Sequence, residues 1–275
     1  MNASQTGSPL PALDAHGHYG NYLDANPLLA EFSSASAAEV AARARACGVS
    51  WTIVSPLDGL LPRGRGQRVA EANERAFVEV AATPGLLQYV IVNPLQPETF
   101  DQARRMLKTE RCVGIKIHPE EHAYRISEFG DQLFRFFEET GASVMTHSGC
   151  PNSLPEDFVP FANRYPGARV MLAHLGNGQG AGGRLDLQVR AVQASRHGNL
   201  WIDTSSARSI LPRLVEWGVR EVGAERLLFG SDTPLYHVAL QRCRIEAAEI
   251  AAADKARILW DNAIEFFRLQ RLLPA

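Results

Sequence analysis

The chain lacks the features that mark several classes of protein. Its 275 residues include four cysteines, none in a C-x-x-C pair, so no disulfide framework is indicated. A net charge of −2 gives no electrostatic pull toward nucleic acid or an anionic membrane. No apolar run approaches the roughly 20 residues that span a bilayer, and residues 1–11 do not resemble a signal peptide. We expect a cytoplasmic protein with neither nucleic acid nor membrane as a partner, and a homo-oligomer stays open.

Lysine is also scarce, because only Lys108, Lys116 and Lys255 occur among the 28 basic residues. Lys116 stands between Ile115 and Ile117 in an apolar run. Because the chain otherwise uses arginine, a lysine here indicates a position at which arginine cannot replace it. A neutral amine could form a carbamate that bridges two metals, whereas an ammonium could neutralise a substrate anion. A third interpretation is a barrel lysine whose stem packs inside while its charge reaches water.

Short runs rich in Val, Ile, Leu and Met recur along the chain, roughly 25 to 40 residues apart, which is the spacing of a strand, a loop and a crossover helix. Continuous apolar runs are typical of strands buried on both faces, as in a parallel sheet. The eight predicted strands are Leu10–His18, Trp51–Ser55, Leu87–Asn93, Val113–His118, Ser143–His147, Arg169–His174, Leu200–Thr204 and Arg226–Ser231.

Helical patterns alternate with these runs, beginning at residues 37–47 with Ser36 as a cap and Gly48 as a stop. Strands and helices that alternate in this way predict an α/β fold, a single (β/α)8 barrel over residues 12–275 preceded by a flexible segment, 1–11. The remaining predicted helices are 69–81, 98–109, 132–140, 185–196, 210–222, 238–252 and 264–272.

Residues that bind metals occur at the ends of five of the predicted strands. His16 and His18 lie two apart and so share a strand face, as do Lys116 and His118 on the fourth strand; His147, His174 and Asp232 end later strands. Each alone has an ordinary explanation, such as a hydrogen-bonded core histidine or an Asp that caps a turn. Together they predict a metal site, because the strand ends of a parallel barrel converge on one mouth and clustered neutral imidazoles need a partner.

These residues, in this order, resemble the amidohydrolase superfamily, and most closely the branch of aminocarboxymuconate-semialdehyde decarboxylase and related small metal-dependent hydrolases. The resemblance rests on segments that cover nearly the whole chain: 14–18, 114–119, 146–149, 173–176, 229–234 and the closing segment 261–267. It implies that His16, His18, His147 and Asp232 bind the metal, with His174 as a second-metal ligand or a base and Lys116 as a bridging ligand. Zinc is the first expectation, manganese, iron and cobalt stay open, and so does the choice between one ion and two.

Hydrolysis is the predicted reaction, because decarboxylases of this branch usually lack a ligand on the fourth strand and Lys116 supplies one. A metal-activated water would cleave an amide, lactone, ester or thioester of a small molecule, with Asp232 and His174 as the catalytic pair. The guanidinium group of arginine can bind a carboxylate through two parallel hydrogen bonds, so arginines near the mouth are candidates for holding an anionic substrate. The predicted substrate-binding residues are His118, Arg63, Arg208 and His237.

Three other interpretations stay open. The same ligands could hold one metal for the non-oxidative decarboxylation of an unsaturated or aromatic acid. Residues 178–183 fit G-x-G-x-x-G, with Asp203 about 20 residues on, which imitates a dinucleotide-binding motif but leaves the histidines unexplained. A barrel that keeps its ligands only for structure or for binding would have a closed metal site without an open position.

Overall fold

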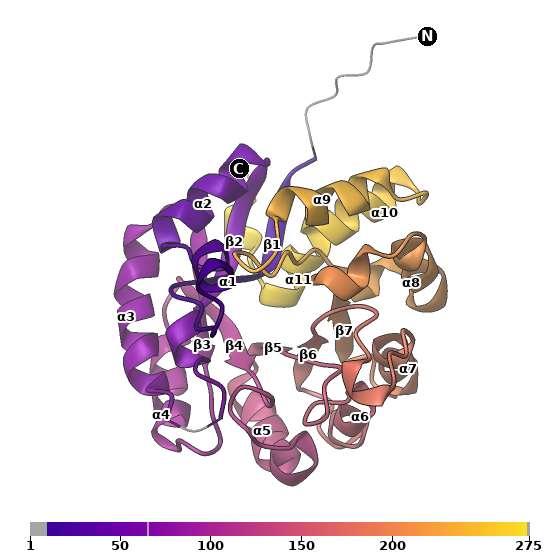
Figure 1. Cartoon of the computed structure of the whole chain (residues 1–275). Coiled ribbons are helices and arrows are strands. Elements are labelled where there is room, and N and C mark those ends of the chain that lie inside the picture. Colours follow the sequence, from indigo (N-terminus) through magenta and orange to yellow (C-terminus); the bar gives the residue numbers. More distant parts are fainter. Residues whose placement is uncertain (1–9, 65, 274–275) are drawn as a thin grey trace.

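The chain folds into a ring of eight parallel strands surrounded by helices, as predicted (Figure 1). The computed structural model describes residues 10–64 and 66–273. The expected loose segment 1–11 therefore lies, up to residue 9, outside the described residues. The strands pair in the order of the sequence: β1 Ala12–Tyr19, β2 Val49–Pro56, β3 Leu86–Ile91, β4 Cys112–Ile117, β5 Ser143–Thr146, β6 Arg169–Leu172, β7 Leu200–Asp203 and β8 Leu227–Leu228.

The strands form because their side chains are buried on both faces. All eight residues of β1 and all six of β3 are buried, which explains why the apolar runs are nearly continuous rather than alternating. The outward faces pack against the helices in one large apolar cluster, while residues such as Leu13 and Met145 belong to a second cluster with the C-terminal residues Phe266 and Phe267. The barrel interior is thus filled with side chains and leaves room only at the strand ends.

Backbone hydrogen bonds close the barrel between β1 and the residues that follow β8. The amide of Ala15 donates to the carbonyl of Phe229 (2.8 Å), that of Asp232 to His16 (2.7 Å), and that of His18 to Thr233 (2.6 Å). We call this the closing seam, residues 15–18 and 229–233. It places His16 and His18 directly beside Asp232, although more than two hundred residues separate them along the chain.

Helices connect the strands on the outside of the ring. Two predicted boundaries are confirmed by cap geometry: Ser36 and Glu39 form a reciprocal capping box at the start of α2, and Gly141 ends α5 in a left-handed conformation at φ 63°. The helices are α1 Pro27–Phe32, α2 Ala37–Ala46, α3 Val69–Ala82, α4 Glu98–Met106, α5 Ile126–Thr140, α6 Pro155–Arg164, α7 Leu187–Ala194, α8 Leu214–Val222, α9 Val238–Ala247, α10 Ala252–Ala256 and α11 Asn262–Phe267.

Three helices were not predicted from the sequence: α1, α6 and the five-residue α10, which follows the predicted helix 238–252. Helix α1 buries none of its residues, so it has no apolar stripe for a periodicity argument to detect. Helix α6 begins at Pro155 and contains Pro160, and a sequence reading treats such prolines as breaks. Within the described ranges, no helix combines the length and apolar character that a membrane crossing requires.

Candidate metal centre

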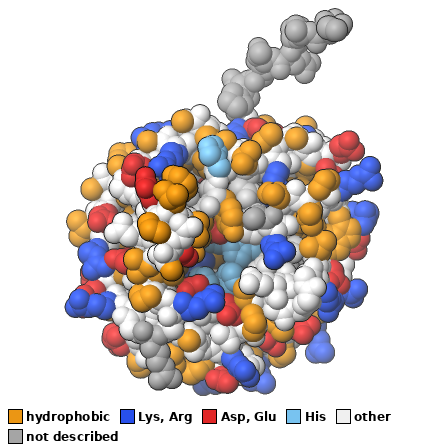
Figure 2. Space-filling view, viewed as in Figure 1, with side chains coloured by type: hydrophobic (Ala, Val, Ile, Leu, Met, Phe, Trp, Pro, Cys, Tyr) orange, Lys and Arg blue, Asp and Glu red, His pale blue; other side chains and the backbone are white. Residues whose placement is uncertain are grey.

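The C-terminal ends of the strands open into a cavity of about 240 Å³, and histidine side chains form its floor (Figure 2). Six of the predicted site residues that come from strand ends line this cavity, which the topology predicted because parallel strands end at the same rim. They are His16, His18, Lys116, His147, His174 and Asp232.

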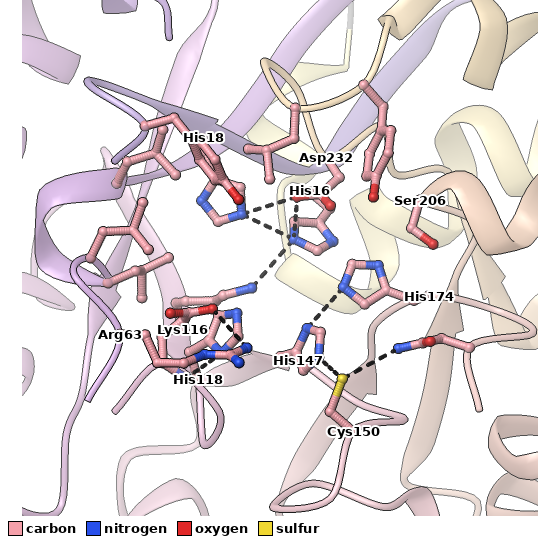
Figure 3. A pocket seen from close by; sticks show the side chains of 18 of the residues that line it. His16, His18, Arg63, Lys116, His118, His147, Cys150, His174, Ser206 and Asp232 are labelled. Atoms are coloured by element: carbon pink, nitrogen blue, oxygen red, sulfur yellow. Dashed lines mark hydrogen bonds and ion pairs between the residues drawn. The ribbon is translucent and has the colours of Figure 1, made fainter. Parts of the chain in front are cut away.

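The tightest part of the site lies on the closing seam. His18 Nε2 is 3.2 Å from Asp232 Oδ1, His16 Nε2 is 3.4 Å from the same oxygen, and the two imidazole nitrogens are 3.3 Å apart (Figure 3). All three side chains are almost fully buried. Ligand atoms on His16, His174 and Asp232 lie within 4.8 Å of one another, a separation that one metal ion can span.

The Nδ1 atoms of His16 and His18, which face away from the cluster, both lie within hydrogen-bond distance of acceptor oxygens. His16 Nδ1 lies 2.6 Å from Asp203 Oδ2, and His18 Nδ1 lies 3.3 Å from the Ser55 carbonyl oxygen, which can only accept. In the neutral tautomers that result, both Nε2 lone pairs face the Asp232 oxygen. Three acceptors this close need a cation among them, which is what a divalent ion would supply. The donor set therefore fits a metal.

His174 and His147 stand beside this cluster. His174 Nδ1 lies 2.8 Å from Ser205 Oγ, which itself donates to Asp203 Oδ1, so the Nε2 lone pair of His174 faces the cavity. There it meets His147 Nδ1 at 3.0 Å, while His147 Nε2 lies 3.1 Å from Cys150 Sγ. His147 can thus join the centre through Nδ1.

Lys116 is buried at the end of β4, and its Nζ lies 3.3 Å from His16 Nε2 and 2.8 Å from Met145 Sδ. In the described part of the chain no carboxylate comes within ion-pair distance of this amine. Burial lowers the pKa of Lys116 to about 8, against the pull of Asp232 and Asp203. The amine is therefore close enough to act on the centre or on a bound anion.

Burial also sets the charge of the other groups. It lowers the pKa of His16, His18 and His147 and brings that of His174 to about 4, so these imidazoles are neutral near pH 7. Burial alone would raise the pKa of Asp232, but positive charge beside it at the His16 and His18 positions brings it below its usual range. The site is thus an ionised carboxylate among neutral nitrogen donors.

Two of these residues have unusual backbone conformations. His174 has φ 72° and Asp232 has φ 60°, in the left-handed region that costs a non-glycine residue about 1–3 kcal/mol. Such positions persist where the surroundings enforce them, and they cluster at functional sites. The conformations add a structural reason to place His174 and Asp232 in the site.

Asp203 is the main site residue that the sequence analysis missed. It is fully buried at the end of β7, holds His16 through Oδ2, and accepts through Oδ1 from the amide of His174 (2.8 Å) and from the amide and hydroxyl of Ser205. The sequence analysis considered Asp203 only as the acidic residue of the possible dinucleotide-binding motif. A stronger signal was available, since Asp203 ends an apolar strand just as Asp232 does.

The predicted substrate-binding residues lie at different places. His118 stacks on His147 with ring centroids 4.4 Å apart, and Arg63 and Arg208 line the cavity. Arg63 pairs with Glu121 and is largely exposed. His237 is exposed, caps α9, and lies outside the central cavity. The structure thus brings three of the four to the mouth.

The glycine-rich segment 178–183 forms a loop with one short 3-10 turn, Gln179–Ala181, rather than the start of a long helix. The amide of Gly180 donates to the carbonyl of Gly149, and Gln179 lines the cavity. Asp203 is buried against His16 and cannot reach a ribose. The loop is part of the cavity wall, and the geometry does not support a dinucleotide site.

Comparison with known proteins agrees with the resemblance seen in the sequence. The sequence model of a family described as Amidohydrolase matches residues 13–269. A gamma-resorcylate decarboxylase of Polaromonas sp. (strain JS666 / ATCC BAA-500) is 25% identical over 129 residues, 40% of this chain and 37% of that protein. The corresponding enzyme of Rhodococcus jostii (strain RHA1) is 27% identical over 129 residues, 40% of this chain and 36% of its own. The matches thus span little more than a third of either relative.

Solved structures share the whole fold. The 5-carboxyvanillate decarboxylase of Sphingomonas paucimobilis superimposes with a TM-score of 0.73 at 18% identity, covering 94% of this chain and 99% of its own. A dihydroxybenzoic acid decarboxylase of Polaromonas sp. JS666, with bound manganese and the inhibitor 2-nitroresorcinol, gives 0.73 at 16% identity, covering 95% and 98%. At these identities the similarity establishes the fold.

The prediction of hydrolysis is wrong on this comparison, because the named relatives and these structural neighbours are decarboxylases. The error came from the weight given to Lys116. A lysine on the fourth strand was interpreted as a bridging ligand, whereas an amine beside His16 and Met145 is equally able to face a substrate anion. The metal ligands themselves do not distinguish the two reactions.

Proposed function

Because this chain belongs to the amidohydrolase family, we propose that it is a metal-dependent decarboxylase that releases carbon dioxide from an aromatic or unsaturated carboxylic acid. The observation that carries the proposal is the convergence of His16 Nε2, His18 Nε2 and Asp232 Oδ1 within 3.4 Å of one another at the floor of an open cavity. The names of the relatives support decarboxylation as the chemistry performed there.

The metal proposed is a divalent ion held by His16, His18, His147 and Asp232, with His174 as a ligand of a second ion where two are bound and as the base where one is bound. When bound there, the ion supplies positive charge that holds and polarises the substrate's oxygen atoms. Zinc suits these nitrogen and carboxylate donors, and manganese, which is bound in the dihydroxybenzoic acid decarboxylase, should be tested beside it. Whether the site takes one ion or two is left to the metal count.

Lys116 is proposed to act as an ammonium that faces the substrate carboxylate. Its pKa of about 8 leaves most of the amine protonated at pH 7, and among the described residues no carboxylate lies within ion-pair distance of it. At the rim, Arg63, Arg208 and His118 supply further polar contacts to an acid in the cavity. The positive charges of Lys116, Arg63 and Arg208 would thus attract an anionic substrate to the cavity.

The reaction breaks the bond between the carboxyl carbon and the substrate carbon that bears it. Carbon dioxide leaves, and the electron pair stays on the substrate carbon, which then takes a proton. We assign the proton transfer to Asp232 and His174, which both line the cavity. His174 is held by two hydrogen bonds, one between its Nδ1 and Ser205 Oγ and one that its backbone amide donates to Asp203 Oδ1, so its Nε2 faces the cavity. General acids and bases need this kind of fixed geometry.

The test uses metal-loaded protein with 2,6-dihydroxybenzoate and 5-carboxyvanillate as probes, the acids named for the structural neighbours. We expect release of carbon dioxide, one deuterium at the substrate carbon when the reaction runs in D2O, and no ¹⁸O in the organic product from labelled water. Hydrolysis would place ¹⁸O in the product, so the isotope pattern separates the two reactions.

Asp232→Asn should lower the turnover number by at least about 100-fold, since it removes a metal ligand and a proton carrier together. His197→Ala changes an exposed histidine away from the cavity and should leave turnover unchanged. Turnover that survives in Asp232→Asn protein freed of metal would contradict the proposal.

A further inference from the structure

The second ring nitrogen of each histidine at the centre has a defined partner. His16 uses an Asp203 oxygen, His18 uses Ser55, and His174 uses the Ser205 hydroxyl. Such outer partners fix which nitrogen of a metal-binding imidazole keeps its proton. These three partners all present oxygen.

His147 is the exception, because its Nε2 faces the sulfur of Cys150 at 3.1 Å (Figure 3). Cys150 is only 7% exposed and lies in the loop after β5. Its Sγ also lies 3.7 Å from Gln179 Oε1 and 4.0 Å from Asn177 Nδ2. The thiol therefore has a second acceptor for its own hydrogen besides His147.

This arrangement permits two states of His147. In the first, the Cys150 thiol donates to Nε2, and His147 donates from Nδ1 to His174 Nε2, 3.0 Å away. In the second, the thiol turns its hydrogen to Gln179 Oε1, and the sulfur accepts from Nε2–H. Only the second state leaves the Nδ1 lone pair of His147 free to bind an ion beside His174.

We propose that Cys150 is a positioning residue of the metal centre: its sulfur accepts the Nε2 proton of His147 and thereby directs the Nδ1 lone pair of His147 to the ion. Gln179 assists by accepting the thiol hydrogen. The inference depends on the metal of the proposed function and is independent of which reaction the centre performs.

Removing the sulfur should weaken metal binding without touching a ligand. In Cys150→Ala protein, His147 Nε2 loses its partner, and we expect the dissociation constant for Zn²⁺ to rise by about 10-fold or more, as for other outer partners. Cys150→Ser keeps an atom that can accept from Nε2–H and donate to Gln179, so its constant should stay within about threefold of the parent. Both are measured by competition with a chromophoric chelator.

The tautomer itself gives a second measurement. Long-range ¹H–¹⁵N spectra of Zn²⁺-loaded, histidine-labelled parent protein should show His147 protonated at Nε2, and its ring signals should shift in Cys150→Ala and remain near the parent values in Cys150→Ser. Cys243→Ala alters an exposed cysteine. It should leave the dissociation constant for Zn²⁺ within about twofold of the parent value and the His147 ring signals in place.

Three results would overturn the inference: unchanged Zn²⁺ binding in Cys150→Ala, equally weak binding in Cys150→Ser, or a parent in which His147 is protonated at Nδ1 when Zn²⁺ is bound. A parent that binds no divalent ion would refute both this inference and the metal of the proposed function. Variants that follow the expected pattern in a protein that releases no carbon dioxide would uphold Cys150 and contradict only the reaction.

Discussion

At the scale of single residues, Lys116 is a buried amine whose charged form is held in the protein interior at a cost in stability. Its pKa of about 8, against an ordinary value of 10.5, means that folding disfavours the charged amine by roughly 3 kcal/mol. In the described chain the amine's closest polar contacts are a histidine nitrogen and a methionine sulfur. Such a group is expected where function requires a positive charge.

Replacing Lys116 with Met should therefore stabilise the protein while it harms catalysis. We expect the free energy of unfolding of chelated protein to rise by about 2 kcal/mol, because an unbranched apolar chain replaces a buried ammonium. At the same time kcat/KM for the acid should fall at least about 10-fold. Urea denaturation and steady-state kinetics measure the two effects, and Lys108→Met, at an exposed site, is the matched control. A variant that is less stable and equally active would contradict this role.

The sequence predicted the residues whose type and position both point to a metal: His16, His18, His147, His174 and Asp232 all lie at strand ends. It did not identify the groups that orient them. The roles of Asp203 and Cys150 depend on which imidazole nitrogen each one faces, and that distance arises only when strands far apart in sequence become neighbours.

At the scale of elements, β8 is the shortest of the eight strands, and only its residues Leu227 and Leu228 pair with β7. The C-terminal helix α11 compensates. Asn262, the first residue of α11, is buried and donates from Nδ2 to the carbonyl oxygens of Ala224 and Leu227, both at 2.7 Å. The side chain thus fixes the start of β8 from outside the sheet.

Asn262→Ala should destabilise the protein by about 2–4 kcal/mol, because it leaves two buried carbonyl groups without their side-chain donor. The urea midpoint measures the loss, and Asn21→Ala, at an exposed position, should change it by less than about 0.5 kcal/mol. A loss for Asn262→Ala as small as that of Asn21→Ala would show that β8 does not depend on this contact.

Element prediction from the sequence succeeded where burial leaves a continuous or a periodic apolar pattern, and it failed where burial leaves neither. The strands were identified because both faces are buried, and α5 was found only in its second half, since the prediction began at residue 132 and the helix begins at Ile126. Helix α1, with no buried residue, offered no pattern to detect.

At the scale of the whole molecule, the predicted ligands lie on both sides of the closing seam. His16 and His18 belong to β1, Asp232 follows β8, and three short backbone hydrogen bonds join the two segments. An ion bound by all three side chains would add a link between the first and last strands of the barrel. Metal binding and barrel closure are therefore expected to be coupled.

Removing the divalent ion with a chelator should lower the midpoint temperature of thermal unfolding. Adding the ion back at 100 times its dissociation constant should restore about 2.7 kcal/mol to the free energy of unfolding. Hydrogen exchange should quicken on chelation at the amides of Ala15, His18 and Asp232, which bridge the seam, more than at the amide of Thr52, which donates to Gly85 elsewhere in the barrel. Equal acceleration at all four amides would argue against a local coupling.

The distribution of ligands also bears on how the protein matures in a cell. Once residues 1–200 have been synthesised, the chain contains His16, His18, His147 and His174, but Asp203, which orients His16, and Asp232 have yet to be made. An assembled cradle for the ion exists only after the last strand emerges. Loading of the ion is thus expected to follow the synthesis of Asp232, so that a chain interrupted before β8 would hold most of the ligands without a site for the ion.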